Sequence, residues 1–233
     1  MKREIGVLAI VVVTACGSNE SPSSNPPLTG PSQTSTQANR SPTISQLSVS
    51  PSFGISQLTS FAMQAAATDP DGDTVSYQWE LGDGNTATGS SVAAKVYGGA
   101  GGTLTVRMTV NDGKGGTSSD TRTVTVGSLT GAWIATIQNF SRIQLELQQT
   151  GGTVAGRFVQ LDSGPQTPAG TSGTTDPAEP GKIDRDGRVE IRLKVGRFLD
   201  FYLRGTMDST GRAIAGGLFG SGFNGNPVTM VKQ

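Results

Sequence analysis

The stretch from Val75 to Gly84 constrains the fold of this 233-residue chain more than any other. Apolar and polar residues alternate from Val75 to Leu81, which places the two sets of side chains on opposite faces of a β-strand. Trp79 belongs to the apolar set, and a buried Trp on a central strand is typical of the core of a small β-sandwich. Gly82-Asp83-Gly84 then predicts a tight turn, because glycine accepts the positive φ that such turns require.

This stretch also carries a family motif, which has the form aromatic-x-Trp-x-hydrophobic-Gly-Asp-Gly. In this chain its residues are Tyr77, Trp79, Leu81, Gly82, Asp83 and Gly84. Because it contains this motif, the segment 43–126 resembles the polycystic-kidney-disease-type (PKD) domain. The resemblance implies an immunoglobulin-like β-sandwich. The alternating runs Phe61–Ala65, Leu104–Val110 and Thr121–Val126 agree with that fold, and we expect six or seven short strands.

Residues 127–233 show the same alternation in an arrangement that predicts a second domain. Ile143–Leu147 and Val189–Val195 each place apolar residues on one face and polar residues on the other. An antiparallel sheet with one wet face loses its exposed edges when it closes on itself. We therefore predict an all-β protein, an immunoglobulin-like β-sandwich followed by a small antiparallel up-and-down β-barrel. The opening Gly131-Ala132-Trp133 is weakly similar to lipocalin- and avidin-type barrels.

The interior of such a barrel is either filled by side chains or open to one small ligand. Four phenylalanines are candidates for that interior, as core or as cavity lining: Phe198, Phe201, Phe219 and Phe223. Both interpretations stay open on the sequence.

Residue counts exclude several classes of function. The chain has no His, which removes the usual general base and the commonest metal ligand, so Ser-His-Asp and Cys-His catalysis are excluded. Its single Cys permits no internal disulfide. The 18 basic residues balance the 18 acidic ones, so no net field attracts nucleic acid. We expect a protein that is not an enzyme and has no nucleic-acid partner.

The amino terminus has the form of an export signal. Lys2 and Arg3 precede a short apolar run, and the run ends in Val13–Cys16. That ending resembles a bacterial lipobox, which implies that residues 1–16 are a lipoprotein signal peptide and that Cys16 carries the lipid. An ordinary signal peptide with a chance Cys is the alternative. Residues 17–42 are rich in Ser, Thr and Pro and predict a disordered tether, or a glycosylated stalk.

Two acidic turns are candidates for site chemistry. Asp69, Asp71 and Asp73 offer the hard carboxylate oxygens that Ca²⁺ prefers, and some PKD domains bind Ca²⁺ at this turn. The alternative is a solvated turn, since Pro-Asp-Gly is favourable turn chemistry. Asp184 and Asp186 lie two residues apart in a turn, which favours solvated acids over a hydrolase pair, because such pairs act from opposite sides of a substrate.

Together these features predict a lipid-anchored protein of the bacterial cell envelope, at the outer membrane if the cell is Gram-negative. The sandwich would act as a spacer or adhesive module, and the barrel would contact a protein or a glycan. Two alternatives remain: a carrier of a small apolar ligand, and an accessory factor in polysaccharide degradation.

Overall fold

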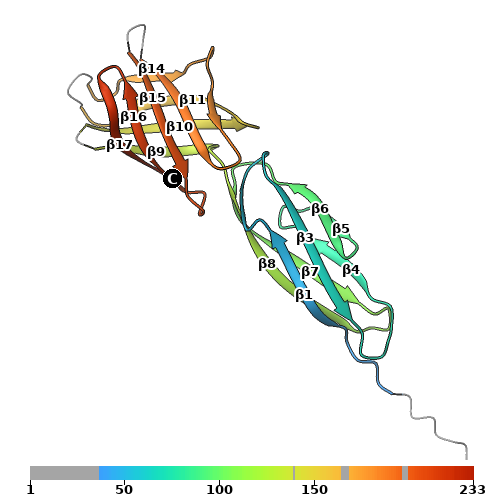
Figure 1. Cartoon of the computed structure of the whole chain (residues 1–233). Coiled ribbons are helices and arrows are strands. Elements are labelled where there is room, and N and C mark those ends of the chain that lie inside the picture. The colour runs from blue at the N-terminus through green and yellow to red at the C-terminus, as the bar shows by residue number, and fades with distance from the viewer. Residues whose placement is uncertain (1–36, 139, 164–167, 196–198) are drawn as a thin grey trace, which may run out of the picture. The chain divides into compact units, whose positions relative to one another are not determined.

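A computed structural model describes residues 37–138, 140–163, 168–195 and 199–233, and its regular structure is entirely β-strand (Figure 1). The prediction of an all-β protein is confirmed. No helix in the described residues is long and apolar enough to cross a membrane. Cys16 and most of the predicted tether lie outside the described residues.

The sandwich domain consists of two sheets. One has the order β1-β3-β6 and the other the order β2-β8-β7-β4-β5 (Figure 1). All pairings are antiparallel except β2 with β8. The strands are β1 (Thr43–Ser50), β2 (Phe53–Ile55), β3 (Ser60–Thr68), β4 (Ser76–Glu80), β5 (Thr86–Thr88), β6 (Ser91–Val96), β7 (Gly102–Asn111) and β8 (Thr117–Gly127).

The predicted central strand is β4, and its Trp is the largest side chain of the sandwich core. Trp79 is 0% exposed, and its indole Nε1 donates a hydrogen bond to the carbonyl oxygen of Gly89 at 2.8 Å. The alternating residues of β7 also point inward, with Val106 and Met108 both buried. The period-2 pattern therefore predicted correctly which residues form this core.

The Gly-Asp-Gly turn after β4 depends on both residue types. Gly82 and Gly84 have a φ of 82°, and a Cβ on Gly82 would lie 2.7 Å from the carbonyl oxygen of Thr105. Asp83 forms an ion pair with Lys95 at 2.6 Å. Desolvation opposes the charge of Asp83, yet hydrogen bonds from Lys95 and Asn85 keep the pKa of its carboxyl below the usual value. The turn is therefore fixed by backbone conformation and by charge.

The second domain is a closed barrel of eight strand positions. Its sheet closes because β10 pairs with both β9 and β11, and β12 and β13 share the position between β11 and β14. Its strands are β9 (Gly131–Ile137), β10 (Arg142–Thr150), β11 (Thr153–Gln160), β12 (Ser172–Thr175), β13 (Gly181–Ile183), β14 (Arg188–Val195), β15 (Leu199–Met207), β16 (Ala213–Gly220) and β17 (Phe223–Lys232). The segment between β11 and β13 thus contains the short strand β12.

One end of the barrel core is completed by residues of the sandwich. Ile55 is 1% exposed and belongs to the hydrophobic cluster of the barrel, with Phe53 and Leu58 packed against it. Beside it, the buried side chain of Gln149 donates from Nε2 to the carbonyl oxygen of Ser56 at 2.9 Å. We call this contact the joint; its side chains are Phe53, Ile55, Leu58 and Gln149.

The joint predicts that the barrel loses stability when Ile55 is truncated. Ile55→Ala should cost about 2 to 5 kcal/mol, because it removes buried methyl groups and leaves a cavity. The chain has two Trp residues, Trp79 in the sandwich and Trp133 in the barrel. In a Trp79→Phe background, the fluorescence of Trp133 during urea unfolding reports the barrel.

The matched control is Leu161→Ala, which removes an apolar side chain that is 37% exposed. It should leave the unfolding midpoint nearly unchanged. If Ile55→Ala shifts the Trp133 transition no more than this control does, Ile55 does not belong to the barrel core.

Tyr97 gives the sandwich a dependence on alkaline pH. Its buried hydroxyl donates to the carbonyl oxygen of Leu81 at 2.8 Å, and desolvation, with the charge of Asp83, raises its pKa to about 12. The pKa of an unfolded Tyr is about 10. Because the folded state holds the proton more tightly, this stabilisation is complete below about pH 10 and is lost as the pH approaches about 12.

The free energy of unfolding, measured with urea, should therefore fall between about pH 10 and pH 12. The fall should be smaller in Tyr97→Phe, which has no hydroxyl to titrate. The difference in phenolate absorbance between wild type and Tyr97→Phe gives the titration of Tyr97 alone. A midpoint near the unfolded value of about pH 10 in the folded protein would contradict the burial of this hydroxyl.

Candidate functional site

The outer wall of the barrel is hollowed where two neighbouring strands carry small residues. Gly205 on β15 pairs with Gly216 on β16, and the neighbouring wall positions of β16 are Ala215 and Gly217. A Cβ on Gly216 would lie 1.9 Å from the carbonyl oxygen of Arg204, so a larger residue does not fit there. The close approach of these two strands therefore requires glycine at both positions, and the small outward-facing residues Ala215 and Gly217 leave a depression in the wall.

This depression is the floor of an open groove of about 1070 Å³. We call it the outer-wall groove. Its lining residues come from β13 to β16 and the adjoining turns, and include Lys182, Asp184, Arg188, Glu190, Arg204 and Phe219.

Aromatic rings and guanidinium groups alternate on the outer wall, where Arg204 and Phe219 line the outer-wall groove and Arg192 and Tyr202 lie beside it. The guanidinium of Arg204 lies 5.5 Å from the ring centroid of Tyr202 and 5.6 Å from that of Phe219. The guanidinium of Arg192 lies 5.4 Å from the ring centroid of Tyr202. Contacts of this length are attractive because the ring face is electron-rich. The row Arg192, Tyr202, Arg204 and Phe219 is therefore held in place by its own members.

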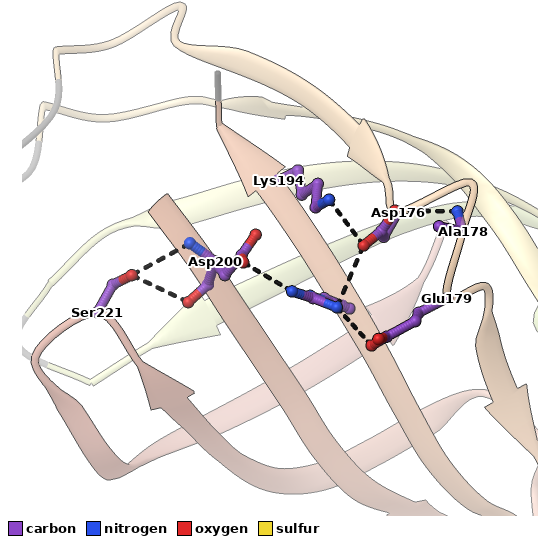
Figure 2. Close-up of polar contacts among 7 residues, drawn as sticks. Asp176, Ala178, Glu179, Lys194, Asp200 and Ser221 are labelled. Atoms are coloured by element: carbon purple, nitrogen blue, oxygen red, sulfur yellow. Dashed lines mark hydrogen bonds and ion pairs between the residues drawn. The ribbon is translucent and has the colours of Figure 1, made fainter. Parts of the chain in front are cut away.

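Arg192 is also the centre of an ion-pair network (Figure 2). It contacts the carboxylates of Asp176, at 3.2 Å, Asp200, at 2.8 Å, and Glu179. The carboxylates of Asp200 and Glu179 raise its pKa. Lys194 pairs with Asp176 at 2.8 Å. The network fixes the chain between β12 and β13 on the wall.

Asp176 is the most buried member of this network. Hydrogen bonds from Lys194 and from the backbone N–H of Ala178, drawn in Figure 2, lower the pKa of its carboxyl. A second hollow, of about 210 Å³, lies beside the network. It shares Lys182 and Glu190 with the outer-wall groove, so the two hollows adjoin.

The interior of the barrel is filled. The space left among its described side chains measures about 20 Å³, which is room for about one water molecule and too little for a ligand. Phe201 is buried, and its ring packs edge-on against that of Phe223 at 5.4 Å. Phe219 lies on the outer wall, which corrects the expectation that it faces inward, and Phe198 lies outside the described residues.

The first acidic turn is occupied by contacts within the protein. Arg40 donates from Nε to Asp71 at 2.8 Å, and this hydrogen bond lowers the pKa of Asp71. Asp69 accepts from the backbone N–H groups of Asp71 and Asp73 through Oδ1, while its buried Oδ2 has no hydrogen-bond partner. Asp73 lies 3.6 Å from Lys114.

In the part of the chain that the structure describes, no three acidic side chains are close enough to hold a metal ion together. Only the free Oδ2 of Asp69 suits a cation at this turn, since Arg40 already engages Asp71. Binding of Ca²⁺ by Asp69, Asp71 and Asp73 stays a prediction. At the second acidic turn, Asp184 and Asp186 both pair with Arg188, at 3.6 and 3.0 Å.

Comparison with known proteins assigns the first domain. Residues 39–126 match the family model of the PKD domain. This segment is a PKD domain. The match begins at Asn39, which donates a hydrogen bond to Asp112 at 2.8 Å, so the PKD domain includes the last residues of the predicted tether.

Two solved structures are similar to parts of the chain. One is the PKD1 domain of Vibrio anguillarum Epp, with 29% identity, coverage of 38% of this chain and 96% of that chain, and a TM-score of 0.31. The other belongs to carbohydrate-binding modules of the β-sandwich superfamily, with 18% identity, coverage of 84% and 86%, and a TM-score of 0.37. Both scores are low, so neither likeness supports a statement on function. No curated protein matches the chain.

Sequence reasoning missed the residues of the outer wall. Tyr202 and Arg204 alternate with the buried Phe201 and Leu203, so period 2 already indicates that they face outward. The pairing that brings Phe219 beside Tyr202 depends on the register of β15 with β16, which composition does not reveal.

The network around Asp176 predicts a dependence on acid pH. Since the pKa of Asp176 is lowered in the folded state, its stabilisation is complete above the unfolded value of about 3.9 and is lost as the pH falls through the folded value. Asp176→Asn should lower the melting temperature at neutral pH, and the gap from wild type should narrow below about pH 4.

Asp186→Asn is the control, because that carboxylate is mostly exposed. It should change the melting temperature little at either pH. If the gap for Asp176→Asn stays constant as the pH is lowered to about 2, the charge of Asp176 contributes nothing to stability.

Proposed function

We propose that this chain is a non-catalytic binding protein of the bacterial cell envelope, anchored by lipid at Cys16, which makes its contact through the outer wall of the barrel. The observation that carries the proposal is the difference between the two faces of the barrel wall. The interior offers about 20 Å³, whereas the outer-wall groove offers about 1070 Å³. A filled interior gives no support to a carrier of small apolar ligands.

The chemistry of the outer-wall groove supports binding without catalysis. Glu190 pairs with Arg204 at 2.7 Å, and Asp184 pairs with Arg188. Both carboxylates are therefore engaged by guanidinium groups within the wall. The chain also has no His to serve as a base.

In this proposal the PKD domain is a spacer between the anchor and the barrel. Two of its acidic side chains are engaged within the domain, Asp71 with Arg40 and Asp83 with Lys95. The tether 17–42 would have an end-to-end distance of about 25 to 30 Å as a flexible coil. That length holds the PKD domain clear of the lipid headgroups.

Cys16→Ser tests the anchor. In the native bacterial host, the wild type should take up labelled fatty acid and fractionate with membranes, because acyl chains add about 0.8 kcal/mol of membrane affinity per buried CH₂. The variant has no thiol to acylate and should appear in the soluble fraction without label.

Ser18→Ala, two residues away, is the matched control and should behave as the wild type. Absence of label in the wild type, or membrane retention of Cys16→Ser, would rule out the lipid anchor.

A further inference from the structure

We propose that the outer-wall groove and the adjoining hollow bind one neutral polysaccharide chain, with Phe219 and Tyr202 as stacking platforms and the Glu190–Arg204 pair as the hydrogen-bonding group between them. This inference rests on the proposed function, because it names the ligand class of the same wall.

The form of the site favours an extended ligand. Pockets that enclose small molecules typically measure about 300 to 1,000 Å³ and surround most of the ligand. The outer-wall groove is open and of about 1070 Å³, and it continues into the hollow of about 210 Å³ through Lys182 and Glu190. A chain that lies across several strands uses this surface more fully than a single small molecule does.

Phe219 and Tyr202 are placed where sugar rings could stack on them. A Cβ on Gly217 would lie 3.2 Å from Cε2 of Phe219, and a Cβ on Gly225 would lie 3.4 Å from its Cε1. The Phe219 ring therefore lies against these two glycines and is half-buried there. Tyr202, its cross-strand partner, is also half-buried. The guanidinium groups of Arg192 and Arg204 cover part of these rings. The part of each ring that stays exposed offers apolar area at low entropic cost, which suits the C–H faces of sugar rings.

The charges in and beside the outer-wall groove balance. Three cations, Lys182, Arg188 and Arg204, line the groove with two anions, Asp184 and Glu190. Asp186, in the adjoining turn, is the third anion, and all three carboxylates pair with Arg188 or Arg204. An anionic polymer requires an excess of cations, which this wall lacks. A guanidinium has five N–H donors and a carboxylate about four acceptor positions, so each pair keeps capacity for hydroxyl groups. Neutral, hydroxyl-rich ligands fit both the balanced charge and the spare hydrogen-bonding capacity of this wall.

The distribution of apolar side chains argues against a protein partner. The core of a protein interface is depleted in charged residues. In the described residues, the exposed large apolar side chains are Val96, Val159, Leu161 and Val231, and none of them lines the outer-wall groove. Charged groups occupy its centre instead.

Affinity electrophoresis and calorimetry on the full chain in detergent test the proposal. The probes are a neutral glucan and a galactomannan, with heparin as a polyanion and chitosan as a polycation. We expect at least one neutral polysaccharide to bind, and Phe219→Ala and Tyr202→Ala each to weaken binding about tenfold, as the loss of one aromatic contact predicts. Tyr202→Phe, which keeps the ring, should retain most of the affinity.

Arg157→Ala is the matched control, because Arg157 and Glu146 form the same kind of cross-strand pair on β10 and β11. It should leave binding unchanged, and Trp133 fluorescence confirms that each variant is folded.

No binding of any neutral probe would overturn the ligand class, and so would a preference for heparin or chitosan. If a neutral polysaccharide binds Phe219→Ala and Tyr202→Ala as tightly as the wild type, its binding site lies elsewhere on the protein. Capture of a protein partner that Phe219→Ala abolishes would also overturn the ligand class while leaving the proposed function intact. The anchor is tested separately by Cys16→Ser, so the two proposals fail independently.

Discussion

The barrel depends on a contact that its own strands do not supply. Ile55 completes its hydrophobic cluster, and Gln149 satisfies the carbonyl of Ser56 beside it. A buried carbonyl without such a donor would cost about 1 to 3 kcal/mol, so the polar and apolar halves of the joint belong together. This contact fills one end of the barrel, and the described side chains leave little space in its middle.

The outer wall has small residues at its centre and long charged side chains around them. Close approach of β15 and β16 requires Gly205 and Gly216, and the small outward-facing residues Ala215 and Gly217 leave the centre of the wall without long side chains. Around the depression, charged side chains are long and are held by partners, as Arg192 is held by three carboxylates. The groove is therefore bordered by ordered groups, whose immobilisation costs little further entropy when a ligand binds.

Much of the fold followed from alternation along single strands. Trp79 and Leu145 are buried where period 2 places them, and the Gly-Asp-Gly turn has the positive φ that its glycines predicted. The sequence also led to the PKD domain, since its motif lies within one strand and one turn. These features are local, and local pattern is sufficient for them.

Features that depend on distant residues were not predictable in this way. Arg40 reaches Asp71 across 31 positions, and Phe219 meets Tyr202 only through strand register. Phe219 was expected inside because of its residue type, although its neighbour Leu218 already occupies the inward position. Residue type predicts average burial, whereas parity along the strand decides which face a residue occupies.

The joint has a consequence for how these two domains evolve. Lys232, near the end of β17, donates to the carbonyl oxygens of Ala100 at 2.6 Å and Ser128 at 2.8 Å, so the last strand of the barrel is tied to the PKD domain as well. A recombination event that joined this barrel to another PKD domain would have to supply an equivalent of Ile55 and acceptors for Gln149 and Lys232. Substitutions on the two sides of the joint are therefore expected to covary.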